Sequence, residues 1–309
     1  MLMNIFTWIT IASLYKINPD ENKHLKNHCG AKHLDVTGVA VPSNKYPFIA
    51  AIARPGKGQR CTGVLISNRH VLTAAHCVYD ISQVYNYTRW YCNPNGQLLP
   101  VPDMTIYPGT KCPKPGECPN GEKRTSYKAR YIIPHPDFKP CPSFVNDLAL
   151  IELDEDANSE EALPICMPEE DDMLHYGTVT GIGYGWDARS RPDKDEPGLQ
   201  EVNLTMAQYK DGKFVTRDYE TAMCGGDSGG PLIPADTSSK ATVFGIGATT
   251  EAKCYDTYAF KDDKMPRAYF TDVRPYLPWI CDITGVCPLR KTTFPSPVSD
   301  GKVWAQRSA

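Results

Sequence analysis

Three short blocks of this sequence hold the residue types that nucleophilic catalysis requires. VLTAAHC ends in His76 and Cys77, NDLALIEL begins with Asn146 and Asp147, and CGGDSGGP contains Ser228. A serine hydroxyl becomes a nucleophile when an imidazole accepts its proton, and a buried carboxylate keeps that imidazole in the required tautomer. Together the blocks predict a nucleophilic serine at position 228.

The glycines around Ser228 fit the same chemistry. Glycine beside a nucleophile lets backbone N–H groups approach a developing oxyanion without a side chain in the way. Each block also has a purely structural interpretation: a packed histidine, an aspartate that opens a strand, and a glycine-rich tight turn. The chain order His, Asp, Ser is one of the few in which this catalytic triad is known, and it favours catalysis.

Composition excludes several classes of protein. The chain has 33 Lys and Arg against 36 Asp and Glu, a formal net charge of −3, so no basic surface for nucleic acid is expected. Twelve cysteines without any C-x-x-C pair argue against a thiolate zinc site and favour disulfides in an oxidising compartment. We therefore expect a monomer with no metal, no cofactor, and no nucleic-acid or membrane partner.

The amino terminus carries an apolar run of eleven residues, Ile5–Tyr15. The run is too short to cross a bilayer but has the length of a signal-peptide core. No Lys or Arg precedes it and no small-x-small cleavage site follows, so a short buried strand is the alternative. We predict a signal peptide at residues 1–15, a propeptide-like segment at 16–35, and secretion to the extracellular space. Sequons at Asn86 and Asn203 fit a secreted glycoprotein.

The remaining chain has the pattern of an all-β protein, in which turn residues separate short apolar runs. Short runs such as GVLIS, DLALIEL and TVFGIGA are rich in Val, Ile and Phe and are bounded by turn residues. This pattern predicts barrels or a sandwich. VRPYLPWICD is the one good helix candidate after the leader. The segment 92–141 is predicted to be a cross-linked surface insert, and residues 286–309 a flexible tail.

The blocks resemble those of the trypsin/chymotrypsin-like serine proteases over about Val36 to Ile280. YPFIAAI, TGIGYG, LQEV and PYLPWI also fall in register with that family. The resemblance implies two perpendicular six-stranded antiparallel β-barrels with a C-terminal helix, in a protease domain at residues 36–285. It further implies a secreted serine endopeptidase, made as a zymogen, with protein or peptide substrates and protease inhibitors as partners.

The resemblance assigns roles to single residues. His76 would be the general base and then the acid, Asp147 its orienter and Ser228 the nucleophile. The backbone amides of Gly226 and Ser228 would form the oxyanion hole. Asp227 would pair with the α-amino group that activation cleavage frees.

The resemblance also implies three disulfides, one beside the histidine, one at the specificity pocket and one tethering the propeptide: Cys61–Cys77, Cys224–Cys254 and Cys29–Cys166. Cys281 and Cys287, separated by five residues, have the spacing for a small loop of their own. Three pairings remain open for the four cysteines of the insert, Cys92, Cys112, Cys118 and Cys141.

The specificity pocket departs from the tryptic pattern. Trypsin-like members carry an aspartate where this chain has Ala222, and without it a buried Lys or Arg side chain would stay unpaired. By the same resemblance, Thr250 would narrow the pocket mouth, and either Ala268 or Arg267 would line its wall. We predict a preference for small or medium apolar residues before the scissile bond. Arg267, one residue away in register, would favour acidic residues if it entered the pocket.

Other departures keep a second function open. The segment between Asp147 and Ser228 is shortened where the family carries a further cysteine and a glycine-rich loop. Residues 248–250 read Ala-Thr-Thr where the family has Ser-Trp-Gly, and no basic residue directly precedes the activation segment Asp35–Gly38. The alternative is a protease-fold binding or regulatory protein with little or no activity. An esterase or lipase of another fold is disfavoured because its histidine would come last.

Overall fold

The computed structural model describes most of the chain, in segments separated by gaps. The described residues are 6–32, 45–54, 60–80, 85–86, 91–92, 97–101, 104–109, 125–141, 143–174, 176–185, 198–218, 221–235, 240–251, 265–298 and 301–307. Antiparallel strands dominate these residues, and no described helix is long and apolar enough to cross a membrane.

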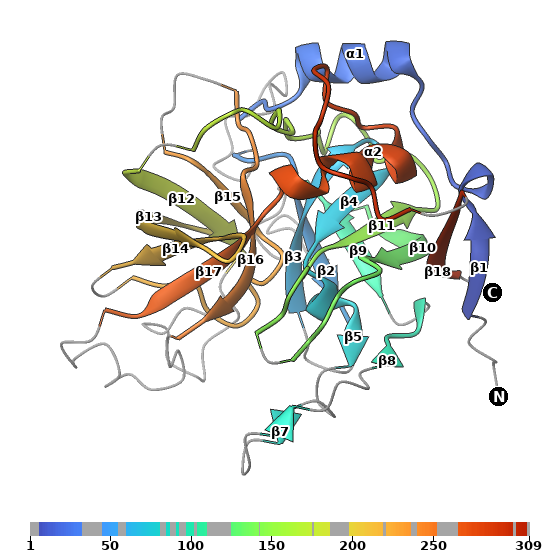
Figure 1. Cartoon of the computed structure of the whole chain (residues 1–309). Coiled ribbons are helices and arrows are strands. Elements are labelled where there is room, and N and C mark those ends of the chain that lie inside the picture. Colours follow the sequence, from blue (N-terminus) through green and yellow to red (C-terminus); the bar gives the residue numbers. More distant parts are fainter. Residues whose placement is uncertain are drawn as a thin grey trace.

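Six antiparallel strands close a first barrel, to the right of the second barrel in Figure 1. Strand β9 pairs with both β2 and β10, and this double pairing closes the ring. The strands are β2 (Ile49–Ala53), β3 (Arg60–Ser67), β4 (His70–Thr73), β9 (Thr105–Pro108), β10 (Tyr127–Pro134) and β11 (Ala149–Leu153). Their branched aliphatic side chains favour strands and fill the interior, with Val64, Leu72 and Ile151 fully buried.

Six further strands close the second barrel in the ring order β12-β13-β14-β17-β16-β15. These strands are β12 (Thr178–Gly183), β13 (Gln200–Lys210), β14 (Lys213–Arg217), β15 (Pro231–Pro234), β16 (Gly245–Thr250) and β17 (Arg267–Asp272). A separate core cluster that includes Phe214, Leu232 and Phe270 fills this barrel. The two-barrel fold predicted from the sequence is thus confirmed.

The predicted C-terminal helix is also confirmed. Helix α2 (Leu277–Thr284) has a proline in its first turn and ends at Gly285, whose φ of +76° is the left-handed cap that glycine supplies. The 3₁₀ turn Arg274–Tyr276 leads into α2. Trp279 of α2 is buried in the same core cluster as the first barrel.

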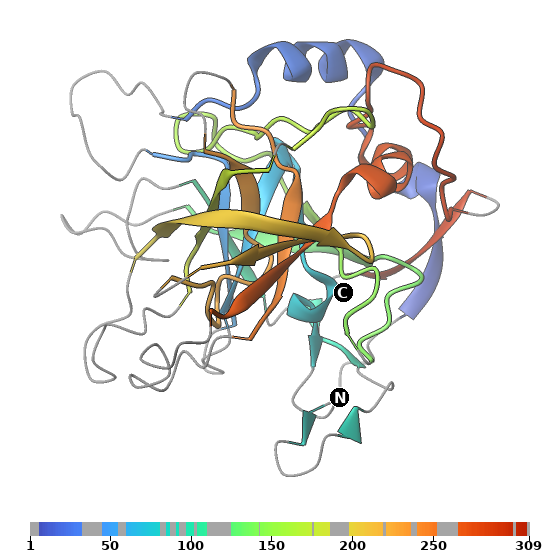
Figure 2. The same cartoon turned by 60° about the vertical axis from the view of Figure 1, so that its left-hand side comes forward.

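The sequence prediction missed a helix, α1 (Pro19–His28), within the propeptide-like segment. The Asn18 side chain accepts hydrogen bonds from the N–H groups of Asp20 and Glu21, and the Glu21 carboxylate accepts one from the Asn18 N–H. This capping box, followed by proline in the first turn, is a sequence signal for a helix start. Figures 1 and 2 show α1 on the outside of the molecule, above α2.

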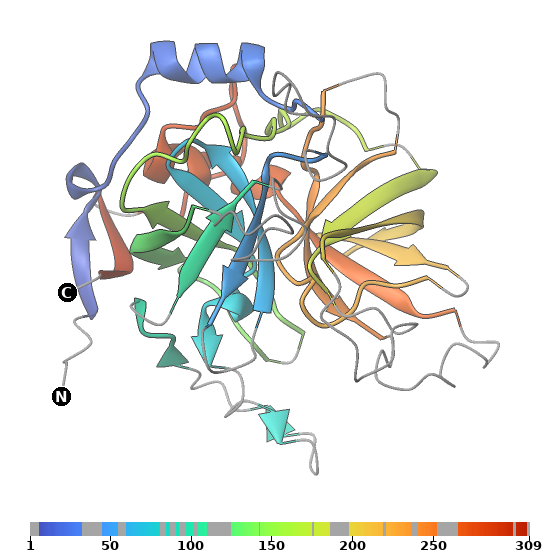
Figure 3. The ribbon, with the colours of Figure 1, turned by 180° about the vertical axis from the view of Figure 1, so that it is seen from behind.

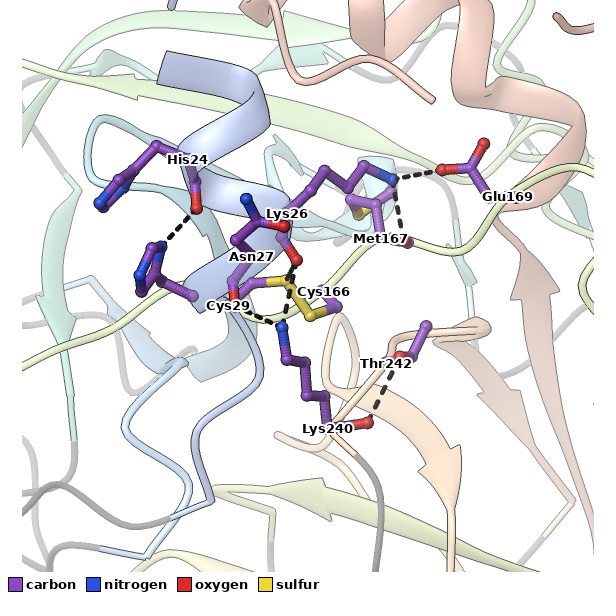
Figure 4. The surroundings of a disulfide bond; sticks show 10 residues. His24, Lys26, Asn27, Cys29, Cys166, Met167, Glu169, Lys240 and Thr242 are labelled. Carbon is purple, nitrogen blue, oxygen red and sulfur yellow. Dashed lines mark hydrogen bonds and ion pairs between the residues drawn. A yellow bond between two sulfur atoms is a disulfide. The ribbon is translucent and has the colours of Figure 1, made fainter. Parts of the chain in front are cut away.

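Covalent and polar contacts hold the end of α1 against the body of the protein (Figure 4). The disulfide Cys29–Cys166 joins the segment to the chain 137 residues later. Lys26 Nζ lies 2.9 Å from the Glu169 carboxylate, with side chains only 10% and 12% exposed. Lys240 Nζ donates to the carbonyls of Lys26 and Asn27, where the helix dipole favours a cation.

The two ends of the chain lie together at the outer edge of the first barrel (Figures 1 and 3). Strand β1 (Phe6–Thr10) pairs with β18 (Lys302–Arg307) along its whole length, and β18 also pairs with β10 at two positions. Residues 6–10 of the N-terminal apolar run form strand β1, and the signal peptide stays a prediction. A 3₁₀ turn, Ile11–Ser13, follows the strand.

The flexible tail predicted for residues 286–309 is wrong for Lys302–Arg307, which form β18. Val286, Val303 and Ala305 are buried, and the last two alternate along β18 as the inward positions of a strand. Lys302–Arg307 is too short and polar for this pattern to stand out in the sequence. Pairing with β1 along its length and with β10 at two positions stabilises the strand.

The predicted surface insert, residues 92–141, is wrong for the residues of β9 and β10, which are strands of the first barrel. Four short strands lie before it or at its start: β5 (Tyr79–Asp80), β6 (Tyr85–Asn86), β7 (Tyr91–Cys92) and β8 (Gln97–Leu98). They form two small ladders, β5 with β8 and β6 with β7. Cys112 and Cys118 lie outside the described residues. Cys141 is disulfide-bonded, and the pairing within the insert stays a prediction.

We expect Asn22→Ala to destabilise the protein by about 1–3 kcal/mol. The buried Asn22 amide donates to the Cys287 carbonyl at 3.0 Å and accepts from the Cys287 N–H at 3.1 Å, so truncation leaves two backbone groups without partners. Urea unfolding measures the effect. Asn27→Ala, on the exposed side of the same helix, is the control and should change stability by less than about 0.5 kcal/mol. Equal losses in the two variants would contradict this role of Asn22.

Candidate active site

Adjacent strands of the first barrel bring His76 and Asp147 together. His76 lies in the 3₁₀ turn Ala75–Cys77 shortly after β4, and Asp147 precedes β11, which pairs with β4. Asp147 Oδ2 lies 2.7 Å from His76 Nδ1, and Asp147 Oδ1 accepts a hydrogen bond of 2.8 Å from the His76 backbone N–H. The carboxylate is fully buried. It therefore fixes the backbone and the ring of His76, with Nδ1 as donor and Nε2 as acceptor.

The turn before Asp147 directs its carboxylate inwards. Asn146 has a φ of +53°, a left-handed conformation that asparagine tolerates better than most residues. Its amide donates to the Asp137 carbonyl at 2.9 Å and accepts from the Tyr276 hydroxyl at 2.8 Å. Phe144, on the same turn, lies with its ring centroid 5.0 Å from that of His76. The turn thus supplies both the carboxylate and an apolar cover for the imidazole.

Ser228 comes from the second barrel, in the turn before β15. Its carbonyl accepts a hydrogen bond of 2.8 Å from the Thr62 N–H and lies 3.5 Å from Cys77 Sγ. The same sulfur lies 3.9 Å from His76 Nε2. The three residues that the sequence singles out for catalysis are therefore brought to one place, with the Cys61–Cys77 disulfide between the histidine and the serine loop.

The residues just before Ser228 form a tight loop. Gly226 has a φ of +103°, which residues with a side chain rarely adopt. The buried Asp227 carboxylate accepts a hydrogen bond of 2.7 Å from Gly185 N–H and one of 2.8 Å from Cys224 N–H. Burial raises the pKa of Asp227 to about 6, and the two N–H donors oppose that rise.

The TGIGYG motif explains how a carboxylate fits beneath this loop. A Cβ atom on Gly185 would lie 2.2 Å from the Asp227 carboxylate, and one on Gly183 would lie 2.4 Å from it. Any side chain at these two positions would displace Asp227. The end of β12 is therefore shaped by the carboxylate that it covers.

A cavity of about 70 Å³ lies beside Ser228. Its lining residues are Met223, Cys224, Gly225, Asp227, Ser228, Gly247, Ala248, Thr249, Thr250, Tyr269 and Phe270. Of the predicted pocket residues, Thr250 lines this cavity, whereas Ala222 and Ala268 do not. Met223, a residue that the sequence did not single out, also lines the cavity.

Arg267 lines a separate groove of about 500 Å³ that adjoins the small cavity. Its guanidinium pairs with Glu251, with an Nη2–Oε1 distance of 2.9 Å and half of the side chain exposed. Lys210 and Lys213 line the same groove, and Thr249 and Tyr269 are common to both spaces. Arg267 therefore does not enter the cavity beside Ser228.

The structure forms the disulfides Cys61–Cys77, Cys29–Cys166 and Cys281–Cys287, and no described cysteine is free. Cys224 is also disulfide-bonded, but its predicted partner Cys254 lies outside the described residues. The activation segment, Asp35–Gly38, lies outside them as well.

One group of potential metal ligands was found among the described residues, formed by His76 and the two cysteines beside it. Both sulfurs belong to the Cys61–Cys77 disulfide. They are therefore not thiolates and cannot act as metal ligands.

Comparison with known proteins identifies the family. The family model described as the nematode trypsin-6-like family matches residues 1–287. The chain belongs to this family. The match extends from the segment before α1 to the loop after α2, so the family pattern includes the residues that contact α1 as well as both barrels.

Curated relatives of this chain are serine proteases by name. Melanization protease 1 of Drosophila melanogaster is 29% identical over 279 residues, which cover 82% of this chain and 66% of the relative. Human granzyme M is 26% identical and mouse granzyme B(G,H) 28%, each with 89% of its length covered by 81% and 79% of this chain. The resemblance to trypsin/chymotrypsin-like proteases is thus confirmed.

Sequence reasoning missed three residues that shape the site. Thr62 contacts the serine loop, Met223 lines the cavity and Phe144 covers the imidazole. Met223 and Thr62 each stand next to a cysteine that was singled out, but neither residue type signals a role. The alternation of side chains between the two faces of a strand could have indicated that Thr62 points into the interior.

The Asp227 pKa predicts a stability change with pH. Because its folded pKa of about 6 is above the unfolded value of 3.8, the folded protein holds a proton that the unfolded chain has lost between these values. The Asp227 contribution is therefore fully present below pH 3.8 and is lost as pH rises through 6, by about 3 kcal/mol. Urea unfolding of wild type and Asp227→Asn from pH 4 to 7 measures it as a difference curve. A flat difference curve would contradict the assignment, and Asp211→Asn, on an exposed turn, serves as the control.

Proposed function

We propose that this protein is a serine endopeptidase that hydrolyses peptide bonds through an acyl-enzyme on Ser228. One observation carries the proposal: the buried Asp147 carboxylate holds the His76 backbone and ring beside the loop that bears Ser228. Membership of a trypsin-like family and relatives named as serine proteases support it.

In the proposed first step, Ser228 Oγ attacks the carbonyl carbon of the substrate while His76 Nε2 accepts the hydroxyl proton. Asp147 stabilises the imidazolium that forms, because its Oδ2 already accepts from Nδ1. The imidazolium then gives its proton to the leaving amine, and the acyl group stays on Ser228. Water, deprotonated by His76, hydrolyses the ester and restores the serine hydroxyl.

The oxyanion of each tetrahedral intermediate would be bound by the N–H groups of Gly226 and Ser228. The positive φ of Gly226 supports this assignment, because successive N–H groups in such a turn form an anion-binding concavity. Preorganised donors of this kind supply a large share of catalysis in acyl transfer.

The cavity beside Ser228 would bind the side chain that precedes the scissile bond. Its volume, about 70 Å³, is roughly half of the 150 Å³ in which an apolar cavity accepts benzene. Asp227 is the only carboxylate among its lining residues, and the backbone donors already occupy it. A small or medium apolar residue therefore fits best.

Secretion and activation complete the proposal. Residues 1–15 would be removed as a signal peptide, and among the described strands β1 pairs only with β18, so its loss leaves the first barrel closed. Cleavage after the tethered segment would free an α-amino group for Asp227, whose carboxylate is buried with a raised pKa. A cation there would stabilise the ionised carboxylate and the loop around it. The enzyme would act outside the cell as a monomer, on protein or peptide substrates.

A fluorophosphonate probe tests the catalytic proposal. The probe should label the wild-type protein covalently, before or after limited proteolysis of the activation segment, and should leave Ser228→Ala unlabelled. Peptide hydrolysis by Ser228→Ala should fall about 10⁴- to 10⁶-fold. Absence of labelling in every wild-type form would favour the binding or regulatory protein instead.

Cleavage of a peptide series that varies only before the scissile bond tests the specificity proposal. We expect kcat/KM for Ala, Val or Leu to exceed that for Arg by about 100-fold or more, because a guanidinium in the cavity would be unpaired. Met223→Ala, which enlarges the cavity, should shift preference towards Phe, with melting temperature as the check on folding. A dominant preference for Arg or Lys would sink this assignment.

A further inference from the structure

Thr62 connects the two barrels directly beneath the serine loop. It stands in β3 of the first barrel, next to Cys61, and is fully buried. Its hydroxyl donates to the Gly226 carbonyl at 2.9 Å and accepts from the Tyr184 N–H at 3.0 Å. Its own N–H donates to the Ser228 carbonyl at 2.8 Å.

These bonds fall on either side of Asp227. Thr62 holds the carbonyl before that residue and the carbonyl after it, while the Asp227 side chain holds Cys224 N–H and Gly185 N–H. The hydroxyl also reaches Tyr184, the neighbour of Gly185 at the end of β12. A single oxygen thus joins the serine loop, β12 and β3.

The backbone conformation of Gly226 must be fixed by hydrogen bonds from other residues. Glycine has no Cβ and its backbone visits many conformations, so the φ of +103° is not set by the residue itself. The Gly226 carbonyl defines the peptide plane that follows Gly226, and the Thr62 hydroxyl is the described partner of that carbonyl. The orientation of the Gly226 N–H, on the other side of the same Cα, depends on this plane being fixed.

We propose that the Thr62 hydroxyl is a positioning residue for catalysis, which orients Gly226 so that its N–H points to the oxyanion. This inference rests on the proposed function and adds a residue of the first barrel to the machinery of the second. Thr62 touches no reacting atom. It acts through Gly226. Because the oxyanion exists only in the transition state, loss of the Thr62 hydroxyl should weaken transition-state stabilisation and leave substrate binding unchanged.

The test compares Thr62→Val, which keeps the shape and loses the hydroxyl, with Thr62→Ser, which keeps the hydroxyl. In the enzyme form that reacts with fluorophosphonate, Thr62→Val should lower kcat about 10- to 100-fold and change KM less than about threefold. Affinity for a peptide trifluoromethyl ketone, whose hemiketal oxyanion mimics the transition state, should fall in parallel with kcat/KM. Thr62→Ser should recover at least a third of wild-type kcat.

Thr284→Val is the matched control. Thr284 is also fully buried, and its hydroxyl likewise donates to a backbone carbonyl, of Ile280 at 2.7 Å, and accepts from a backbone N–H, of Val286 at 3.0 Å. Thr284→Val should lower the melting temperature about as much as Thr62→Val and leave kcat within about twofold of wild type. Equal kinetic losses in the two variants would reduce Thr62 to a structural residue and overturn the proposal.

The outcomes separate this inference from the proposed function. Wild-type labelling together with unchanged kcat in Thr62→Val, or a change in KM alone, overturns only the role of Thr62. If no wild-type form is labelled, the proposed function fails.

Amide hydrogen exchange at Gly226 then tests whether the Thr62 hydroxyl orients this residue. The Gly226 amide should exchange faster in Thr62→Val than in wild type, Thr62→Ser and Thr284→Val. Equal exchange rates would overturn the positioning role of Thr62.

Discussion

The candidate site depends on the hydrogen bonds that cross the boundary between the two barrels. His76 and Asp147 belong to the first barrel and Ser228 to the second, so neither barrel contains the constellation alone. The Thr62 N–H and hydroxyl, both donated from β3, join the serine loop to the first barrel. The buried Asp227 carboxylate then holds the loop to the end of β12. Loss of these hydrogen bonds would move His76 away from Ser228 while both barrels stayed folded.

Two buried carboxylates fix the positions of the residues at this boundary. Asp147 and Asp227 are both buried, and each accepts two hydrogen bonds from described backbone or ring N–H groups. A buried carboxylate is costly unless such donors surround it. The surrounding chain therefore has few alternative arrangements. Gly183 and Gly185 are required because a Cβ atom at either position would occupy the space of the Asp227 carboxylate. Gly230 is required because a Cβ atom there would lie 2.2 Å from the Ile182 carbonyl oxygen.

Much of this could be predicted from the sequence. The blocks around His76, Asp147 and Ser228, together with short β-type runs, indicated the fold and the residues that meet at the site. The pocket residues were less predictable. Thr250 lines the cavity but Ala222 and Ala268 do not, because the space depends on how the larger Met223 side chain packs. Residues 302–307 were missed because the stability of this strand comes from its two partners, β1 and β10, and not from its own composition.

Helix α1 was missed although its capping box marks a helix start, and the contacts that hold it against the protein come from distant segments. The disulfide to Cys166, the Lys26–Glu169 pair and the bonds of Asn22 to Cys287 all attach it to parts of the chain more than 130 residues away. A cut between residues 32 and 45 would therefore break the polypeptide, but these contacts would still hold α1 to the rest of the protein. The two pieces would stay joined by the Cys29–Cys166 disulfide and would separate only after reduction and unfolding.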